Sequence, residues 1–191
     1  MKITLLPGDG IGVEIVDAAV EVLDAAAKKF GFEIEYDKQL IGGCAIDATG
    51  VPLPEATVAS AKAADAVLLG AVGGPKWDNV APDIRPEKGL LGIRKALGLY
   101  CNLRPMTVSR FTAHLSPLKT ENAEGADLLI VRELTGGIYF GEHNEAHINA
   151  DGVEEASDVE LYTRPEVERI AKFAFEAAKK RRGKVTSVDK A

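Results

Sequence analysis

The chain has 191 residues, of which 46% are hydrophobic and 27% charged, and its formal net charge is −6. This composition is typical of a globular protein with one ordinary domain or two small ones, and the negative charge argues against general affinity for nucleic acid or an anionic membrane. No apolar run is long enough to span a bilayer, and the start MKITLLPGDG lacks the form of a signal peptide. Two distant cysteines, Cys44 and Cys101, are typical of reduced thiols. We therefore expect a cytoplasmic globular protein.

Strand and helix patterns alternate through the first part of the chain. The predicted elements are a strand at 2–6, a helix at 12–30, a strand at 32–40, a helix at 55–64 and a strand at 65–72. Residues 41–54 contain several glycines and prolines and are predicted as a loop. The last of these strands, DAVLLGAV, is almost continuously apolar, as in a strand buried on both faces of a parallel sheet. This order predicts an α/β doubly wound fold with a mixed or parallel sheet.

Two glycine-rich segments follow strands of this sheet. The turn GDGIG, residues 8–12, differs in spacing from the dinucleotide fingerprint GxGxxG; its backbone amides suit an anion or a cofactor edge, and a plain tight turn explains it equally well. Residues 73–87 form a long loop that carries the only tryptophan, Trp77. Ligands of such sheets bind at the carboxyl ends of the strands, and long loops of this kind are often functional. The loop is therefore a candidate binding segment.

The helix predicted from residue 87 to 98 has two different faces on a wheel of about 100° per residue. One face is apolar and is predicted to face the core: Ile93, Ala96, Leu97 and Tyr100. The other combines charge with leucines: Glu87, Leu90, Leu91 and Arg94. An arginine beside leucines suits a ligand with a carboxylate and a branched apolar group. With Arg104 and Arg132 it would bind a multiply charged carboxylate, although any one of these arginines alone is more typical of a solvated surface.

The second part of the chain is less regular. Residues 99–108 are predicted as extended and 127–133 (DLLIVRE) as a buried strand. The acidic residues 142–162 predict a projecting β-hairpin that buries one face on a second copy of the chain. A helix at 163–182 opens with a capping box, and a last strand is predicted at 184–189.

The predicted domains are residues 1–104 and residues 105–191. The chain stops just after its last predicted strand, so we expect it to be truncated and the second domain to be incomplete. His143 and His147 are four residues apart but do not form the HExxH zinc motif, and we expect them to be solvated or at an interface.

Six stretches resemble the metal-dependent, β-decarboxylating 2-hydroxyacid dehydrogenases, the isocitrate/isopropylmalate dehydrogenase family. They are LLPGDGIGVEI, IGGCAIDATGVPLP, LLGAVGGPKWDN, RPEKGLLGIRKALGLYCNLRP, VRELTGGIYFG and TSVDKA, and they extend over the whole chain. The resemblance implies the two-domain α/β fold of that family, with residues 1–104 on the NAD side and residues 105–191 in the dimerisation and substrate domain. Family members are longer, which implies that the metal-binding aspartates lie beyond Ala191 and that this chain alone is inactive.

The resemblance also implies a role for particular positions. The implied substrate-binding residues are Leu90, Leu91, Arg94, Arg104 and Arg132, and the implied NAD-binding residues are Ile11, Gly74, Pro75, Lys76, Trp77 and Glu87. Tyr139 would protonate the enolate that remains after CO₂ loss, and Lys190 would act as the general base or the proton relay for the 2-hydroxyl group across a dimer interface. The implied cofactors are NAD and Mg²⁺ or Mn²⁺, and the implied assembly is a homodimer with shared active sites.

Within the family, the Glu87–Leu90–Leu91–Arg94 face favours 3-isopropylmalate as the substrate, with oxidative decarboxylation to 2-oxoisocaproate in leucine biosynthesis. The alternatives are another β-decarboxylating dehydrogenase, acting on tartrate, D-malate, isocitrate or homoisocitrate. A further alternative, from a different class, is a non-catalytic binding or regulatory subunit that keeps the fold and the arginines without a metal site.

Overall fold

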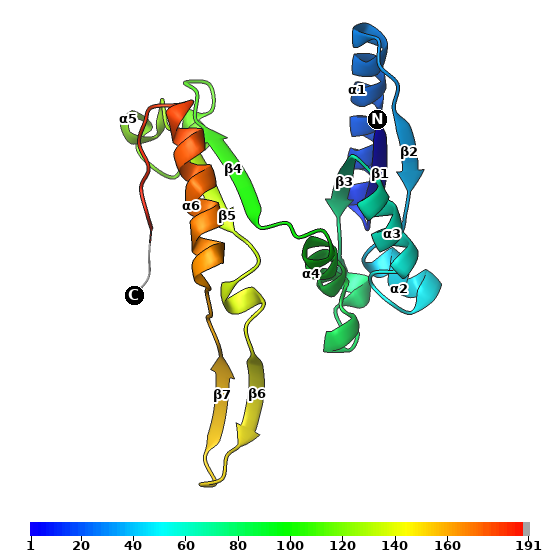
Figure 1. Cartoon of the computed structure of the whole chain (residues 1–191), viewed down its shortest axis with the longest axis vertical. Helices are drawn as coiled ribbons and strands as arrows, with labels where there is room; N and C mark the ends of the chain where they lie inside the picture. Colours follow the sequence, from blue (N-terminus) through cyan, green and yellow to red (C-terminus); the bar gives the residue numbers. More distant parts are fainter. Residues whose placement is uncertain (189–191) are drawn as a thin grey trace. The chain divides into compact units, whose positions relative to one another are not determined.

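The computed structural model describes residues 1–188, and the chain divides into two compact units, Met1–Gly98 and Leu99–Ala191 (Figure 1). The boundary falls before the one expected at Arg104. Arg104 lies inside strand β4 (Cys101–Thr107), and the whole of this strand is paired with a strand of the second unit. No helix within residues 1–188 is both long and apolar enough to cross a membrane.

The first unit contains a parallel sheet of three strands in the order β2-β1-β3. The central strand is β1 (Lys2–Gly8), and it pairs with β2 (Glu35–Lys38) and β3 (Ala66–Ala71). A central strand has neighbours on both edges and helices over both faces, which explains why nearly every residue of β1 is buried. The predicted α/β class with a parallel sheet is confirmed.

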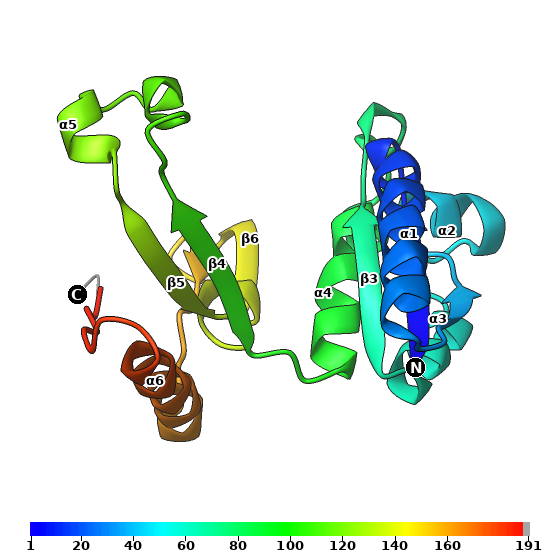
Figure 2. The same ribbon diagram turned by 90° about the horizontal axis from the view of Figure 1, so that it is seen from above.

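Helices cover the two faces of this sheet (Figure 2). Helix α1 (Ile11–Phe30) packs with Val16 against Ile3 and Leu5 of β1. Helices α3 (Glu55–Ala63) and α4 (Pro86–Ala96) pack against Leu6 on the opposite face through Ala61 and Ile93. Successive strand residues point to opposite faces, so neighbouring positions of β1 serve two separate apolar clusters.

Residues 41–54 were predicted as a loop, and this prediction is wrong for one segment. Gly43–Thr49 forms helix α2, which ends at Gly50 in the left-handed conformation. The helix has no side-chain cap from its own N-cap residue, Gly42. A carboxylate far away in the sequence caps it instead, and nothing in the sequence of residues 41–54 indicates that contact.

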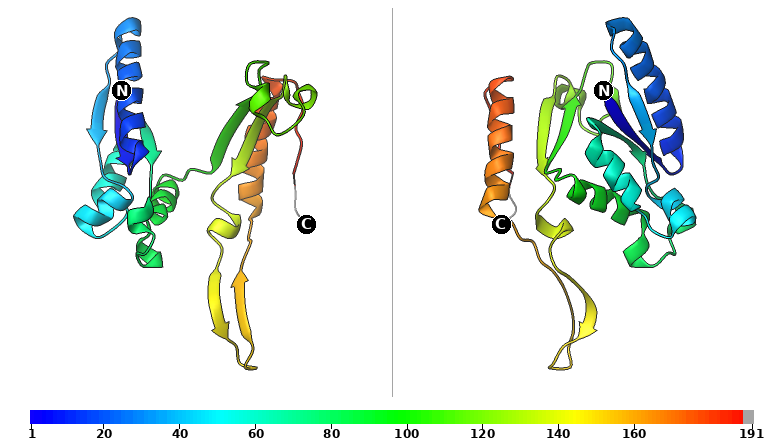
Figure 3. Two further views of the ribbon diagram at one scale, coloured as in Figure 1. Left: turned by 180° about the vertical axis from the view of Figure 1, so that it is seen from behind. Right: turned by 45° about the vertical axis from the view of Figure 1, so that its right-hand side comes forward.

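The second unit is built on an antiparallel ribbon of β4 and β5 (Asp127–Glu133), with α6 (Arg164–Lys179) packed against β5. A short helix, α5 (Thr120–Ala123), lies in the connection between the two strands. Strands β6 (His143–Ile148) and β7 (Glu154–Asp158) pair as a hairpin that projects beyond the ribbon and α6 (Figure 3). Every residue of both hairpin strands is exposed, so the hairpin has no core of its own.

Two sequence predictions fail in this unit. Residues 127–133 were predicted as a buried strand, but no residue of β5 is fully buried, and Leu128 and Ile130 are 48% and 51% exposed. The reason is that α6 packs on one face of the ribbon. Within the described residues 1–188, the side chains on the other face, which alternate along the strand, are not covered by another element. Residues 184–188 of the predicted last strand form no strand, and Asp189 lies outside the described residues.

Candidate active site

A single buried carboxylate organises the carboxyl end of the parallel sheet. Asp9, in the turn after β1, is 3% exposed. Its Oδ2 accepts hydrogen bonds from the backbone N–H groups of Gly43 (2.7 Å) and Gly73 (2.8 Å), and its Oδ1 accepts one from Cys44 (2.7 Å). Charge-assisted bonds of this kind are strong, and a carboxylate at a helix N-terminus is favoured by the helix dipole. Asp9 thereby ties the first turn, the start of α2 and the loop after β3 together.

The loop after β3 and the start of α4 form a small pocket. Its lining residues are Gly74, Trp77, Asp78, Arg85, Pro86 and Glu87. The volume is about 300 Å³, at the lower end of the range of about 300–1,000 Å³ for ligand sites. Three of the residues that the resemblance assigns to NAD binding, Gly74, Trp77 and Glu87, therefore line one pocket.

The other three residues of that set lie elsewhere in the first unit. Pro75 belongs to the same loop, in a short 3-10 turn with Lys76 and Trp77, but is not among the lining residues. Ile11 opens α1 and is 58% exposed. Lys76 turns away to Asp47 of α2, with 2.6 Å between Nζ and Oδ2.

Asp47 holds the loop on α2 from outside the pocket. Besides the Lys76 ion pair, its Oδ1 accepts a hydrogen bond from Trp77 Nε1 at 3.2 Å. The hydrogen bond from Lys76, followed by that from Trp77, lowers the pKa of the Asp47 carboxyl. Trp77 also lies over Gly43, where a Cβ atom would come within 2.3 Å of the indole. These contacts fix the indole that forms one wall of the pocket.

Helix α4 presents the mixed face that its sequence predicts. The helix is anchored by buried Pro86, Gly89 and Ile93, and a Cβ atom on Gly89 would lie 2.5 Å from the carbonyl oxygen of Pro52. The residues of the mixed face lie outside that anchor: Glu87 is exposed, and Leu90, Leu91 and Arg94 are half-buried. Tyr100, predicted on the core stripe of this helix, instead follows Gly98 in the second unit, because the helix ends at Ala96.

The ribbon of the second unit brings two predicted substrate-binding arginines onto one face. Asn102 is the register partner of Arg132, and Arg104 is the partner of Ile130. Directly opposed residues share a face of an antiparallel pair, so Arg104 and Arg132 are diagonal neighbours on it. Arg104 is exposed and donates from Nε to Asn102 Oδ1 at 2.7 Å, and Arg132 is half-buried. Arg94 belongs to the first unit.

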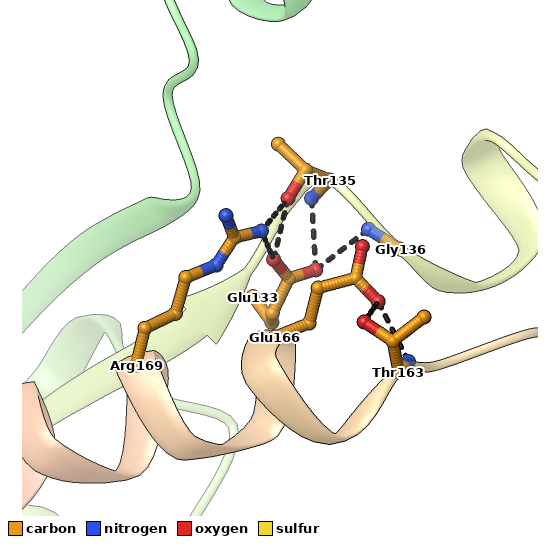
Figure 4. Close-up of polar contacts among 6 residues, drawn as sticks. All are labelled: Glu133, Thr135, Gly136, Thr163, Glu166 and Arg169. Carbon is orange, nitrogen blue, oxygen red and sulfur yellow. Dashed lines mark hydrogen bonds and ion pairs between the residues drawn. The ribbon is translucent and has the colours of Figure 1, made fainter.

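On the opposite face, next to Arg132, Glu133 forms a dense polar cluster (Figure 4). Its carboxylate accepts hydrogen bonds from the N–H groups of Thr135 and Gly136 and from Thr135 Oγ1, each at 2.8 Å, and pairs with Arg169 of α6 at 3.0 Å. Burial opposes ionisation of Glu133, but the hydrogen bonds from Thr135, Gly136 and Arg169 outweigh it, so its pKa is lowered. This cluster holds the chain just before the 3-10 turn Gly137–Tyr139.

The side chains of the two predicted catalytic residues, Tyr139 and Lys190, lie outside the described part of the structure. The backbone of Tyr139 ends the 3-10 turn, while its side chain and the whole of Lys190 lie outside the described residues. Within residues 1–188, no group of three His, Cys, Asp or Glu side chains lies close enough together to hold a metal ion. The described residues therefore do not fit the divalent cation that the resemblance implies.

The sequence patterns did not predict a role for three residues that shape this site, Asp9, Glu133 and Arg169. Asp9 lies between two glycines, and a lone acid in such a turn was a possible signal of a backbone clamp. Glu133 lies two residues before a Thr-Gly-Gly segment, which is again typical of a carboxylate that caps a turn. Arg169 had no local signal, since its partner Glu133 is 36 residues away.

Comparison with known proteins gives a consistent result. A sequence model of the isocitrate/isopropylmalate dehydrogenase family matches residues 2–191. A 3-isopropylmalate dehydrogenase of Bacillus licheniformis is 59% identical over 190 residues, which cover 100% of this chain and 51% of that protein. A chloroplastic 3-isopropylmalate dehydrogenase of Arabidopsis thaliana is 56% identical over 99% of this chain and 47% of its own length. The chain thus spans about half the length of the curated relatives it matches.

Solved structures agree with the sequence relatives. The crystal structure of isocitrate dehydrogenase from Methylococcus capsulatus has a TM-score of 0.72 and 34% identity, with 96% of this chain and 49% of that one covered. A β-decarboxylating dehydrogenase from Thermococcus kodakarensis has a TM-score of 0.65 and 36% identity, with 94% of this chain and 46% of that one covered.

Proposed function

Because this chain belongs to the isocitrate/isopropylmalate dehydrogenase family, we propose that it forms the substrate-binding part of an NAD-dependent 3-isopropylmalate dehydrogenase. The reaction is the oxidative decarboxylation of 3-isopropylmalate to 2-oxoisocaproate in leucine biosynthesis. The observation that carries the proposal is the mixed face of α4, in which Arg94 shares a helix face with Leu90, Leu91 and the pocket residue Glu87.

The substrate has two carboxylates and one branched apolar group, and the chain offers both kinds of contact. Arg104 and Arg132 share one face of the β4–β5 ribbon, and a pair of guanidiniums there suits a carboxylate, because each is a planar fork of N–H donors. Leu90 and Leu91 supply apolar contact for the isopropyl group, and Arg94 supplies a further cation. A dicarboxylate without a branch leaves both leucines without a partner.

The chemical steps are assigned to two residues by resemblance. Lys190 accepts the proton of the 2-hydroxyl group, and Tyr139 donates a proton to the carbon that loses CO₂. When bound, NAD⁺ is the acceptor of the hydride from C2. The pocket beside Trp77 and Glu87 suits the end of the cofactor that reacts, since Glu87 belongs both to this pocket and to the mixed face of α4. No residue described is assigned to a metal ion.

The proposed assembly is a homodimer formed through the β6–β7 hairpin. The hairpin has no core of its own, yet Ile148, Val153 and Leu161 in and beside it are 65%, 57% and 64% exposed. Large apolar side chains on a projecting ribbon favour burial against a second copy of the chain. We assign the enzyme to the cytoplasm, which is consistent with its two free cysteines.

The test is a comparison of substrates with the complete protein. Steady-state kinetics with NAD⁺ and Mg²⁺ are measured for 3-isopropylmalate, D-malate and isocitrate. We expect kcat/KM for 3-isopropylmalate to exceed that for D-malate by about tenfold or more, because one apolar group in a fitted pocket contributes about 10–200-fold. A preference for D-malate or isocitrate contradicts the proposed substrate, while absence of turnover with all three contradicts the proposed activity.

A further inference from the structure

We propose that Glu133 and Arg169 are positioning residues, which hold the turn between β5 and the Tyr139 segment in the geometry that proton transfer requires. This inference rests on the proposed function, because that function gives Tyr139 its role. Both residues are absent from the set assigned to substrate or cofactor, and the cluster they form is visible in Figure 4.

The first support is the geometry of the Glu133 carboxylate. One of its oxygens accepts the N–H groups of Thr135 and Gly136, and the other accepts the Thr135 hydroxyl, so the side chain folds back over the turn that follows it. The side chain is only 11% exposed. Two backbone donors held by one carboxylate leave the turn little freedom, because a rotation of either peptide breaks a charge-assisted bond.

The second support is the way that Arg169 bridges separate segments. Its guanidinium pairs with Glu133, bonds to the Thr135 hydroxyl and stacks on the ring of Tyr100 with 4.7 Å between Cζ and the ring centre. The carbonyl of Tyr100 in turn accepts the N–H of Leu134 at 2.9 Å. Arg169 keeps this arrangement although its Nε is buried with no hydrogen-bond partner among the described residues, so its other contacts must outweigh that cost.

The third support is the close packing of Tyr162 against the same turn. Gly136 and Gly137 are buried, and a Cβ atom on Gly137 would lie 2.3 Å from Tyr162 Oη. The N–H of Gly137 donates to the carbonyl of Leu161 at 2.9 Å. The turn is therefore contacted by both the Glu133–Arg169 pair and Tyr162, which together restrict the direction in which the backbone enters the Tyr139 segment.

If Glu133 only stabilised the fold, it would not need to lie beside the turn before Tyr139. A second ion pair between β5 and the α6 segment, formed by Asp127, provides the control. Asp127 lies on the same face of β5, at the opposite end, and pairs with Arg181 at 2.6 Å and with Arg182 at 3.3 Å just beyond α6. It joins β5 to the same helical segment but is remote from the turn in sequence. Asp127→Asn therefore removes an ion pair between β5 and the end of the α6 segment, although a more exposed one (41% against 11% for Glu133), without touching the Tyr139 segment.

The kinetic test uses Glu133→Gln, Asp127→Asn, Tyr139→Phe and the double variant Glu133→Gln/Tyr139→Phe in the complete protein. We expect Glu133→Gln to lower kcat for 3-isopropylmalate by about tenfold or more while KM changes less than about threefold, and Asp127→Asn to keep kcat within about twofold. The double variant should be no slower than Tyr139→Phe, because Glu133 acts only through the tyrosine. Equal losses in Glu133→Gln and Asp127→Asn, or losses that multiply in the double variant, overturn the proposal.

A second measurement needs no turnover. Amide hydrogen exchange of residues 134–141 should be faster in Glu133→Gln than in wild type and in Asp127→Asn, and unchanged exchange overturns the proposal. If Glu133→Gln does not fold, Thr135→Val removes only the hydroxyl that bonds to both partners and should give a smaller loss of the same kind. A wild-type protein without activity towards 3-isopropylmalate contradicts the proposed function, whereas the exchange comparison still decides the positioning of the turn.

Discussion

Asp9 Oδ2 accepts a hydrogen bond from the backbone N–H of Gly43 at 2.7 Å, so a residue of the first turn caps a helix that begins much later in the chain. The same carboxylate holds Cys44 and Gly73. The walls of the pocket depend on this arrangement, because Trp77 packs on Gly43 and the lining residue Gly74 follows Gly73. One buried acid thus links the core of the first unit to its candidate cofactor site.

Asp9→Asn should therefore destabilise the first unit. The amide has a single oxygen acceptor and brings N–H donors into a place where three backbone donors converge. We expect the free energy of unfolding in urea to fall by about 2–4 kcal/mol. The control is Asp17→Asn on the exposed side of α1, which should change it by less than about 0.5 kcal/mol. An equal effect of both substitutions contradicts the role assigned to Asp9.

Arg94→Ala should weaken binding of the substrate in the transition state. Loss of a desolvated contact between a guanidinium and a carboxylate costs about 2–4 kcal/mol, which corresponds to a decrease in kcat/KM of about 30- to 1,000-fold. Lys95→Ala is the matched control, because Lys95 is the next residue of α4 and is exposed. If kcat/KM is unchanged in Arg94→Ala, this side chain does not touch the substrate.

Leu90→Ala should change the choice of substrate more than the activity itself. The shorter side chain loses apolar contact with an isopropyl group, so kcat/KM for 3-isopropylmalate should fall by about 10- to 100-fold. D-malate has no branch, and its kcat/KM should change less than about threefold. The ratio of the two values is the measurement. A parallel loss for both substrates indicates that Leu90 supports the fold of α4 instead.

Ser60→Ala should change how the free energy of unfolding depends on pH in the acidic range. Hydrogen bonds from Ser60, followed by those from Gln39, lower the pKa of the Asp37 carboxyl. The ionised carboxylate therefore stabilises the folded state at pH values above the ordinary aspartate pKa of about 4. This stabilisation is lost as the pH falls through the lower pKa of the folded state. Without Ser60 the pKa should rise towards that ordinary value, as measured by carbon-13 NMR of the Asp37 carboxyl. The loss of the buried Thr4–Ser60 hydrogen bond adds about 1 kcal/mol of destabilisation at neutral pH.

The proposed dimer should be more stable at high salt. The hairpin segment contains no lysine or arginine, and its acidic residues are Glu142, Glu145, Asp151, Glu154, Glu155, Asp158 and Glu160. Two such hairpins repel each other, and an increase in ionic strength from about 0.05 M to 0.5 M screens that repulsion. Sedimentation equilibrium should give a lower dimer dissociation constant at the higher salt concentration. A dissociation constant that rises with salt contradicts association through this acidic surface.

Much of the architecture was accessible from local patterns. The apolar period of residues 12–30 predicted α1, and the alternation of strands and helices predicted the α/β class. The capping box at Thr163 and Glu166 is confirmed, with Glu166 Oε2 accepting from both the N–H and the hydroxyl of Thr163 at 2.7 Å. The resemblance to the isocitrate/isopropylmalate dehydrogenase family is confirmed over residues 2–191. The helical period and the capping box are local features, because each depends on residues within a few positions of one another.

The sequence alone determined the family, the helices with a strong period and the mixed face of α4. Only the tertiary structure decided that Asp9 caps α2, that Arg104 and Arg132 share a face, and that Arg169 reaches Glu133. The physical reason is the same in each case. A hydrogen bond or a strand register between distant segments depends on how those segments pack, and neither segment carries a local pattern for its partner. The types of residue that the site needs can therefore be identified from the sequence, while their arrangement in space depends on how the fold packs.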